Sequence, residues 1–561
     1  MTRIVSTPAV RAALIEGREI ALLDVREEGP YSRGHPLFAV SLPLSRLELK
    51  VLDLVPRFDA PIVLYDDGGG LVERAEARLC ALGYTDVARL DGGLDGWRRA
   101  GGEVFIDVNV PSKAFGELVE SKRHTPSLSA REVDRLIAEK ADVVVLDSRR
   151  FEEYRNMSIP TGTSVPGGEL VLRLQDMAPR PETTVIVNCA GRTRSIIGTQ
   201  SLINAGIPNP VFALRNGTIG WTLAGLDLDR DAGRRFPKLS AAARAAALSR
   251  ARALSERMGV RSVSRDTVEE WRREPRGFTL FLLDVRNPEE FEAGHLPGFR
   301  SAPGGQLVQA TDEWVGVRHA RLVLADDDGV RATLAASWLI QMGWRNVHVV
   351  AGGIAGGELE IGPRPPRRPP FPATDVLPLA PEVLAAMLDE TVVVDLATSP
   401  RHTAGHVPGA WFVVRARLAA ALHGLPAGRR LVLTSCDGTL ARYAAADLAA
   451  LTDRPVAVLA GGTRAWEAAG LPIERGLMRA VEEVDDVYKR PTRAPTTRRP
   501  RCRPISIGNS ALSSSSLATE PTALKCSERS EVRGFNPLNW HHARSRAARR
   551  ISRDHRRRGQ D

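Results

Sequence analysis

Residues 185–195 read VIVNCAGRTRS and combine a cysteine with two arginines, Arg192 and Arg194, directly after a β-branched apolar run. Cysteine reacts as a thiolate, and nearby positive charge stabilises that form. A loop from a strand end to a helix start turns successive N–H groups inward, and the helix N-terminus adds roughly half a positive charge. The pattern therefore indicates that Cys189 is a nucleophile in an anion-binding loop.

The other loop residues have roles in the same interpretation. Gly191 allows a tight turn, and Ser195 is expected to cap the following helix. The alternative is that Cys189 is a small buried core residue, the usual state of a cysteine after a strand. The predicted binding residues around the catalytic Cys189 are Ala190, Gly191, Arg192, Thr193, Arg194 and Ser195.

Four copies of one unit surround this loop. Each copy has a helical pattern, an apolar strand ending in Asp, a turn, a second strand with a polar loop, a helix, a third strand and a Gly-rich segment that is expected to start a closing helix. Short apolar strands alternating with helices predict a parallel sheet covered on both faces. The predicted fold class is therefore α/β, with four tandem small doubly wound parallel-sheet domains. The Asp-ending strands are LLDVR (22–26), VLDSR (145–149), LLDVR (282–286) and VVDLA (393–397).

Linkers set the boundaries of these units. AAARAAALSRARALSERMG (241–259) predicts a connecting helix, and GPRPPRRPPFPATD predicts a stiff Pro-rich linker. The predicted domains are residues 1–105, 125–228, 262–362 and 378–475.

Composition restricts the classes of function. The net charge of the 561 residues is +10, but residues 489–561 carry 18 Lys and Arg against 5 Asp and Glu. The remainder, with 59 basic and 62 acidic residues, is nearly neutral and gives no sign of nucleic-acid binding. No run of about 20 apolar residues predicts a membrane span. Five scattered cysteines and the lack of a signal-peptide pattern predict a cytoplasmic protein.

Several motifs resemble the rhodanese family of sulfurtransferases over residues 1 to about 475: LLDVRNPEEFEAGHLPGF, GHVPGA, AGGTRAWEAAG and CAGRTRS. The resemblance implies four tandem rhodanese domains and a double displacement. A cysteine takes the outer sulfur of thiosulfate or a similar donor as a persulfide, and a cyanide or thiol acceptor then removes it. Cys189 matches the family's catalytic cysteine. The family interpretation makes Asp147 and Arg149 supports for the loop, while the alternative is a salt-linked surface pair; no cofactor and no metal is expected.

The loops of the other units differ at the position of Cys189. Asp66 and Asp326 stand there in units one and three, and an aspartate cannot carry a sulfane sulfur, so both units are expected to be inactive. In unit four the alignment favours Ser435 and inactivity, although Cys436 lies one residue later. Cys80 is expected to pack in a core. Unit two has Ser158 where the other turns have histidine, a change expected to spare catalysis.

Two other functions remain open. A cysteine phosphatase or arsenate reductase would use a similar loop, but cysteine phosphatases place one residue more between Cys and Arg than the four found here. A non-catalytic sulfur carrier or scaffold, serving a sulfur-relay protein, fits three degenerate loops. The expected partners are a small sulfur donor and a thiol or cyanide acceptor, and two arginines favour doubly charged thiosulfate.

The segment 489–561 is rich in Arg, Ser, Pro and Thr, with little periodicity. This composition predicts a disordered basic tail, the one part of the chain suited to nucleic acid. The alternative is that a change of reading frame in a GC-rich gene produced it. Cys502 and Cys526 in this segment carry no predicted role.

Overall fold

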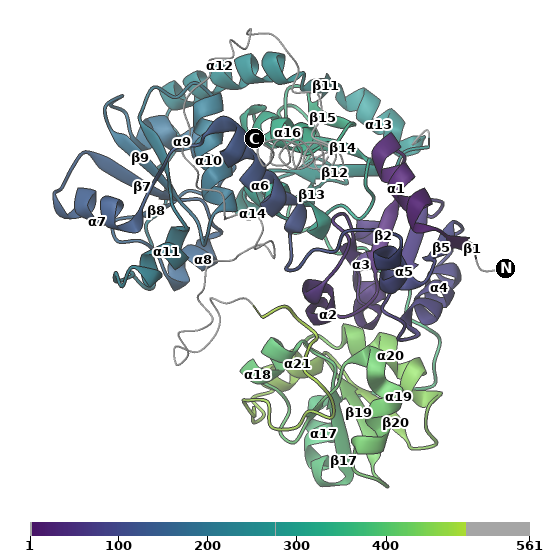
Figure 1. Ribbon diagram of the computed structural model, residues 1–561. Coiled ribbons are helices and arrows are strands. Elements are labelled where there is room, and N and C mark those ends of the chain that lie inside the picture. Colours follow the sequence, from purple (N-terminus) through teal and green to yellow (C-terminus); the bar gives the residue numbers. More distant parts are fainter. Residues whose placement is uncertain (1–2, 275–276, 490–561) are drawn as a thin grey trace, which may run out of the picture. The chain divides into compact units, whose positions relative to one another are not determined.

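The computed structural model describes residues 3–274 and 277–489 (Figure 1). The chain divides into two compact units: described residues 3–7, 21–108 and 365–489 form unit 1, and described residues 8–20 and 109–364 form unit 2. Except for Lys489, the predicted disordered tail, including Cys502 and Cys526, lies outside the described residues. Each unit contains two five-stranded sheets, which we call domains 1 and 4 in unit 1 and domains 2 and 3 in unit 2.

Domains 1 and 4 make up unit 1. The elements of domain 1 are β1 (Arg3–Val5), β2 (Ala21–Asp24), α2 (Glu28–Arg33), β3 (Val40–Ser41), the 3₁₀ helix η1 (Leu44–Arg46), α3 (Leu47–Leu54), β4 (Ile62–Tyr65), α4 (Leu71–Ala81), β5 (Val87–Leu90) and α5 (Gly93–Arg99). Those of domain 4 are β16 (Leu377–Leu379), α17 (Pro381–Ala386), η3 (Leu388–Glu390), β17 (Thr391–Asp395), α18 (Ser399–Ala404), β18 (Trp411–Phe412), η4 (Arg415–Arg417), α19 (Leu418–Ala421), η5 (Leu422–Gly424), β19 (Arg430–Thr434), α20 (Thr439–Ala449), β20 (Val456–Leu459) and α21 (Gly462–Ala468).

Domains 2 and 3 make up most of unit 2, together with nearly all of α1 (Thr7–Glu16) and two linker helices, α6 (Val110–Arg123) and α12 (Ala241–Met258). Domain 2 contains β6 (Ser127–Leu128), α7 (Ala130–Ala138), β7 (Val143–Asp147), α8 (Phe151–Asn156), β8 (Thr163–Ser164), α9 (Leu170–Met177), β9 (Thr184–Asn188), α10 (Thr193–Asn204), β10 (Val211–Leu214) and α11 (Gly217–Leu223). Domain 3 contains β11 (Arg261–Val263), α13 (Arg265–Arg273), β12 (Leu280–Asp284), α14 (Pro288–Ala293), β13 (Arg300–Ser301), α15 (Gly304–Gln309), η2 (Thr311–Glu313), β14 (Arg321–Ala325), α16 (Val330–Gln341) and β15 (Val347–Val350).

All four sheets are parallel and share one strand order. In domain 2 the order is β6-β10-β9-β7-β8, so β9 is the central strand and β7 lies beside it. The register pairs Asp147 at the end of β7 with Asn188 at the end of β9. Ligands of such sheets bind beyond the carboxyl ends of the strands, where the chain reverses direction across the sheet. The predicted fold class is confirmed for the described residues, and Cys189 directly follows the central strand.

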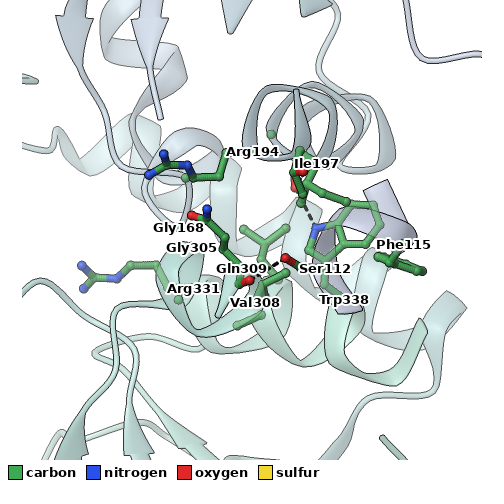
Figure 2. A pocket seen from close by; sticks show the side chains of 17 residues that line it. Ser112, Phe115, Gly168, Arg194, Ile197, Gly305, Val308, Gln309, Arg331 and Trp338 are labelled. Atoms are coloured by element: carbon green, nitrogen blue, oxygen red, sulfur yellow. Dashed lines mark hydrogen bonds between the residues drawn. The ribbon is translucent and has the colours of Figure 1, made fainter. Parts of the chain in front are cut away.

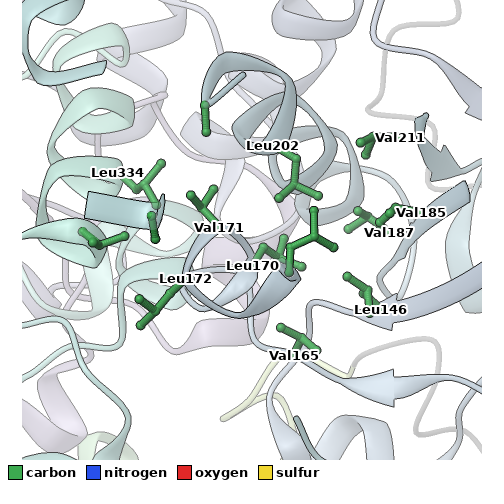
Figure 3. Close-up of a cluster of buried hydrophobic side chains, with 14 of the residues drawn as sticks. Leu146, Val165, Leu170, Val171, Leu172, Val185, Val187, Leu202, Val211 and Leu334 are labelled. Atoms are coloured by element: carbon green, nitrogen blue, oxygen red, sulfur yellow. The ribbon is translucent and has the colours of Figure 1, made fainter. Parts of the chain in front are cut away.

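A buried apolar cluster supports this strand in domain 2 (Figure 3). Val185 and Val187 of β9 pack with Leu170 of α9 and Leu202 of α10, all fully buried. Leu334 of α16 in domain 3 belongs to the same cluster, so the core continues from one domain into the next. Burial of each such side chain contributes roughly 1.5–3 kcal/mol, which makes β9 a rigid base for the loop.

Equivalent positions of domains 2 and 3 meet where the two domains pack together. The Trp338 indole Nε1 donates to the Ser201 hydroxyl at 2.8 Å, and these residues occupy the same place in α16 and α10. A Cβ on Gly305 would lie 2.9 Å from the backbone nitrogen of Gly168, its counterpart in domain 2. The absence of side chains at these two glycines therefore permits the close approach of the domains.

Domains 1 and 4 of unit 1 also contact each other, here through charged side chains. The buried Arg415 guanidinium of η4 binds both carboxylate oxygens of Glu48 in α3, at 2.6 and 3.0 Å. Arg78 of α4 pairs with Asp447 of α20 at 2.6 Å. These two helices occupy the same place in their domains, as α10 and α16 do in unit 2. Domains 1 and 4, at the two ends of the sequence, therefore form a pair comparable to domains 2 and 3.

Two predictions about local structure are wrong. Residues 351–357 of domain 3 form turns and no closing helix, because four glycines in this segment make helix formation costly. Cys80 is exposed, because the buried face of α4 carries Val72, Ala75 and Leu79, and the next residue lies about 100° further round the helix. The predicted connecting helix at 241–259 is confirmed by α12. Among the described residues, no helix has the length and apolar character needed to cross a membrane.

Candidate active site

The loop of residues 189–192 joins β9 to α10, and α11 holds its first peptide groups. Thr218 N donates to the carbonyl of Cys189 at 2.9 Å, and Ile219 N donates to the carbonyl of Ala190 at 3.0 Å. The N–H of a trans peptide points opposite to its carbonyl. Because these carbonyls face α11, the N–H groups of Ala190 and Gly191 face the other way, into the loop.

Gly217 makes this contact between loop and helix possible. Its φ is +52°, and a Cβ there would lie 2.3 Å from the carbonyl oxygen of Cys189 and 2.8 Å from that of Gly191. The glycine-rich segment at the end of each repeat therefore has a structural role that was not predicted. It lets the backbone of the closing segment come against the loop.

The Cys189 thiol lies inside the loop and is 2% exposed. Its Sγ is 3.5 Å from the hydroxyl oxygen of Ser195, which in turn donates to the carbonyl of Arg192 at 2.8 Å. The prediction that Ser195 caps the helix is wrong: Arg192 is the N-cap residue, and Ser195 lies within the first turn of α10. Its side chain turns back toward the sulfur because the third residue of a helix faces the loop that precedes it.

The loop N–H groups are free of protein acceptors within the described part of the chain. The backbone nitrogens of Ala190, Gly191, Arg192, Thr193 and Arg194 donate no hydrogen bond to any other described residue. Orphan N–H groups at a helix start are a site for an anion. The predicted binding residues thus come together around the sulfur through their backbone.

Asp147 and Arg149 form a buried ion pair beneath the loop, so the alternative of a surface pair is wrong. The Arg149 guanidinium contacts both oxygens of Asp147, at 2.8 and 2.6 Å, and both side chains are at most 3% exposed. The Asn188 amide, adjacent to the cysteine, donates to the same carboxylate at 2.8 Å. Asp24 with Arg26 and Asp284 with Arg286 repeat this pair in domains that lack the cysteine, which indicates a structural support.

Arg194 is held by a carboxylate on α8. The Arg194 guanidinium forms a bidentate ion pair with the Glu153 carboxylate, at 2.7 and 3.0 Å. The Arg194 side chain is 10% exposed. Burial would lower the pKa of Arg194, but the hydrogen bond and charge of Glu153, with a contribution from Cys189, more than offset this and raise the pKa. Arg331 and Glu290 repeat the pair in domain 3 at 2.6 Å.

Arg192 is held by two carboxylates of α6. Its guanidinium contacts both oxygens of Glu117, at 2.8 and 3.0 Å, and also the carboxylate of Glu120. The hydrogen bond that Arg192 donates to Glu117 is the main cause of the raised pKa of Arg192. The two arginines of the loop are therefore paired with three glutamates, and their positive charge is compensated.

The equivalent loops of domains 1 and 3 each contain an anion, supplied by the protein itself. The Asp66 carboxylate accepts from Gly68 N at 2.9 Å and Leu71 N at 2.8 Å. The Asp326 carboxylate accepts from Gly329 N at 2.6 Å and Ala332 N at 3.1 Å. An aspartate at the cysteine position thus fills the nest of N–H groups that stays open around Cys189.

Domain 4 places Ser435 at the position of Cys189. Thr463 N donates to the Ser435 carbonyl at 3.0 Å, as Thr218 N does to Cys189, and Arg464 N donates to the Cys436 carbonyl at 2.9 Å. Cys436 therefore corresponds to Ala190. Burial, followed by the charge of Asp395, raises the pKa of the Cys436 thiol, which disfavours its reactive thiolate form.

The turn of domain 2 keeps the backbone bridge of the other domains although Ser158 replaces the histidine. Ser158 forms an isolated β-bridge with Asp229, as the histidines of the other three domains do with the segments that follow their sheets. The bridge uses only backbone atoms, so it forms in domain 2 without the histidine. The histidines in question are His35, His295 and His406.

Sequence reasoning missed five residues of this site: Glu117, Glu120, Glu153, Asn188 and Gly217. Only Gly217 carried a usable signal, because a glycine recurs at its position in every repeat. The three glutamates are ordinary residues of amphipathic helices, and their sequences give no hint of which arginine they meet.

Domain 2 thus places a buried thiol among free backbone N–H groups at the carboxyl edge of a parallel sheet, the edge at which ligands of such sheets bind. The model of the rhodanese-like domain matches residues 7–100, 129–224, 265–359 and 380–469. The chain belongs to the rhodanese-like family and has four tandem domains of it.

Two relatives extend this assignment. The chain is 55% identical to the thiosulfate sulfurtransferase of Pseudomonas aeruginosa, whose crystal structure matches with a TM-score of 0.86 over 89% of this chain and 94% of that one. It is 24% identical over 233 residues to the thiosulfate sulfurtransferase of Azotobacter vinelandii, covering 34% of this chain and 84% of the relative. The chain is a rhodanese-type sulfurtransferase.

Proposed function

We propose that domain 2 transfers a sulfane sulfur from thiosulfate, or a similar donor, to a thiophilic acceptor through a persulfide on Cys189. One observation carries this proposal. The loop that surrounds a carboxylate in domains 1 and 3 surrounds a thiol in domain 2, with its N–H groups open. An anionic donor has a place to bind only there among these three loops.

The chemistry takes two displacements at sulfur. The Cys189 thiolate attacks the outer sulfur of thiosulfate, an S–S bond forms to the enzyme, and the S–S bond of the donor breaks to release sulfite with its electron pair. Cyanide or a thiolate then attacks the terminal persulfide sulfur, leaves as thiocyanate or a new persulfide, and returns the Cys189 thiolate. No external oxidant or reductant enters either step.

The loop residues divide this work among them. The N–H groups from Ala190 to Arg194 bind the donor's oxygens and then the negative terminal sulfur of the persulfide. Arg194, fixed by Glu153, adds its field at the sulfur. Ser195 contacts Cys189, while Asp147 and Arg149 keep the strand ends in place beneath the loop.

Sulfur transfer from thiosulfate to cyanide, measured as thiocyanate, tests the proposal. Cys189→Ser should abolish turnover, whereas the matched control Cys436→Ser should retain at least half of it. After incubation with thiosulfate, intact-protein mass spectrometry should find one added sulfur atom, on Cys189. A persulfide on Cys436 with none on Cys189 would overturn the assignment.

A sulfur carrier is the second candidate function, favoured by the loops of domains 1, 3 and 4, which lack a cysteine at the position of Cys189. In that case a sulfur-relay protein would deliver the persulfide, and small donors would turn over poorly. Persulfide formation from a protein donor, without thiocyanate production from thiosulfate, would select this function. A reducing cytoplasm is part of both proposals, because Cys80, Cys189 and Cys436 are free thiols.

A further inference from the structure

The carboxylates that meet Arg192 come from a helix outside the catalytic domain. Helix α6 covers Val110–Arg123, between the family matches at 7–100 and 129–224. It packs against the start of α10, where a Cβ on Gly116 would lie only 3.1 Å from the Thr193 side chain. This close approach brings Glu117 and Glu120, from successive turns of α6, onto Arg192.

Helix α6 is fixed in this position by contacts with domains 2 and 3. Its Phe115 ring packs edge-on against Trp338, with ring centroids 5.9 Å apart. The Ser112 hydroxyl donates to the carbonyl of Gln309. Ser112 and Phe115 of α6 line a small pocket of about 40 Å³ together with Arg194 and Trp338 (Figure 2). The two glutamates are thus held beside the loop by a packed helix.

The charges beside the loop have a consequence for the donor. Arg192 and Arg194 contribute two positive charges, and Glu117, Glu120 and Glu153 contribute three negative ones. Glu153 is 27% exposed and serves Arg194, which is itself nearly buried. Glu117 and Glu120 are 41% and 28% exposed and both contact Arg192, which is 33% exposed, so an anion that binds the Arg192 guanidinium meets both carboxylates.

We infer that Glu117 and Glu120 are specificity-determining residues, which compete with the donor's negative charge for Arg192 and so select donors of low charge over dianions. The inference rests on the proposed function of Cys189. A dianionic donor must displace the glutamates from Arg192 or bind beside them. A donor with a single negative charge loses less binding free energy to this competition, because the loop N–H groups are sufficient to bind it.

The linker helix before domain 3 shows the same arrangement with opposite signs. Arg244 of α12 pairs at 2.6 Å with Asp328, which stands in the loop of domain 3 two residues after Asp326. In both cases the helix preceding a domain places a charge opposite to that of the loop. In domain 3 the loop is already filled by a carboxylate; in domain 2 the paired charge lies beside an open site.

The test is the double substitution Glu117→Gln with Glu120→Gln, which keeps size and hydrogen-bonding oxygens while removing both charges. Sulfur transfer to cyanide is measured with thiosulfate, a dianion, and methanethiosulfonate, a monoanion. Loss of two partly exposed charges should lower KM for thiosulfate by roughly three- to tenfold. KM for the monoanion should change by less than twofold, and kcat should stay within twofold for both.

Two controls isolate the cause. Glu139→Gln with Glu182→Gln removes two exposed charges elsewhere on domain 2 and should leave both KM values unchanged. Arg192→Ala should cancel the gain of the double substitution, because the gain depends on the freed guanidinium. A gain that persists without Arg192, or equal KM changes for both donors, overturns the inference.

The outcomes also separate this inference from the proposed function. If the unmodified chain transfers sulfur and the double substitution leaves both KM values as they were, only the inference fails. If the unmodified chain transfers sulfur from methanethiosulfonate but not from thiosulfate, and the double substitution makes it active with thiosulfate, sulfur transfer through Cys189 and the inference are both supported. If neither chain transfers sulfur or forms a persulfide, both are overturned. A single Glu120→Gln substitution, with Glu117 left in place, gives a smaller effect of the same sign should the double one misfold.

Discussion

Replacement of Gly217 by alanine probes how the loop geometry depends on one close backbone contact. The new Cβ would lie 2.3 Å from the Cys189 carbonyl oxygen, at a φ of +52°. Real Cβ atoms stay at least 3.0 Å from such neighbours, so the loop or the start of α11 must move by roughly 1 Å. The left-handed conformation itself costs an alanine about 1 kcal/mol.

We expect this displacement to reduce kcat/KM for thiosulfate about 100-fold, the usual effect of a 1 Å misplacement of a reacting group. The hydrogen bonds from Thr218 N and Ile219 N to the loop carbonyls are lost or lengthened. Free energy of unfolding should fall by about 1–3 kcal/mol, as expected for strain plus weakened hydrogen bonds.

The assay compares Gly217→Ala with Gly353→Ala, which places a Cβ 2.4 Å from the carbonyl of Asp326 in domain 3. Both variants should lose similar stability in urea denaturation, but only Gly217→Ala should lose activity. Full activity of Gly217→Ala would show that the contact does not position Cys189. An equal loss of activity in Gly353→Ala would show that the effect is general destabilisation.

Two further predictions concern buried charges. Burial raises the pKa of Asp326 from 3.8 to about 6, so the native protein binds more protons than the unfolded chain in this interval. Relative to Asp326→Asn, the wild type should therefore lose about 2–3 kcal/mol as the pH rises from about 4 to about 6, measured by urea denaturation. Burial lowers the pKa of His319 and His348, but both histidines are present in the two proteins, so their effects cancel in the comparison. A stability difference between wild type and Asp326→Asn that does not change with pH would contradict the raised pKa of Asp326. Asp147→Ala leaves Arg149 buried without its partner and should destabilise domain 2 by about 3–5 kcal/mol, seen as faster proteolysis; unchanged stability would refute the supporting role.

The repeats, the fold class and the loop were predictable because short-range patterns encode them. Apolar runs such as those before Asp147 and Cys189 specify buried parallel strands, and the residues after them specify turns and helix starts. The substitution of Asp66 and Asp326 for cysteine could also be seen in the sequence, since the alignment of the repeats shows it directly. Only the structure shows that these aspartates accept hydrogen bonds from the N–H groups of their loops.

The sequence by itself determined that a cysteine stands in a loop with two arginines at the edge of a parallel sheet. Tertiary structure decided what those arginines do, because Arg192 lies 72 and 75 residues from its partners and Arg194 lies 41 residues from Glu153. Periodicity reports which face of a helix is buried, but not which helix it meets. The charge beside Cys189 therefore depends on the packing of α6 and α8, since long-range contacts alone bring their carboxylates to the loop.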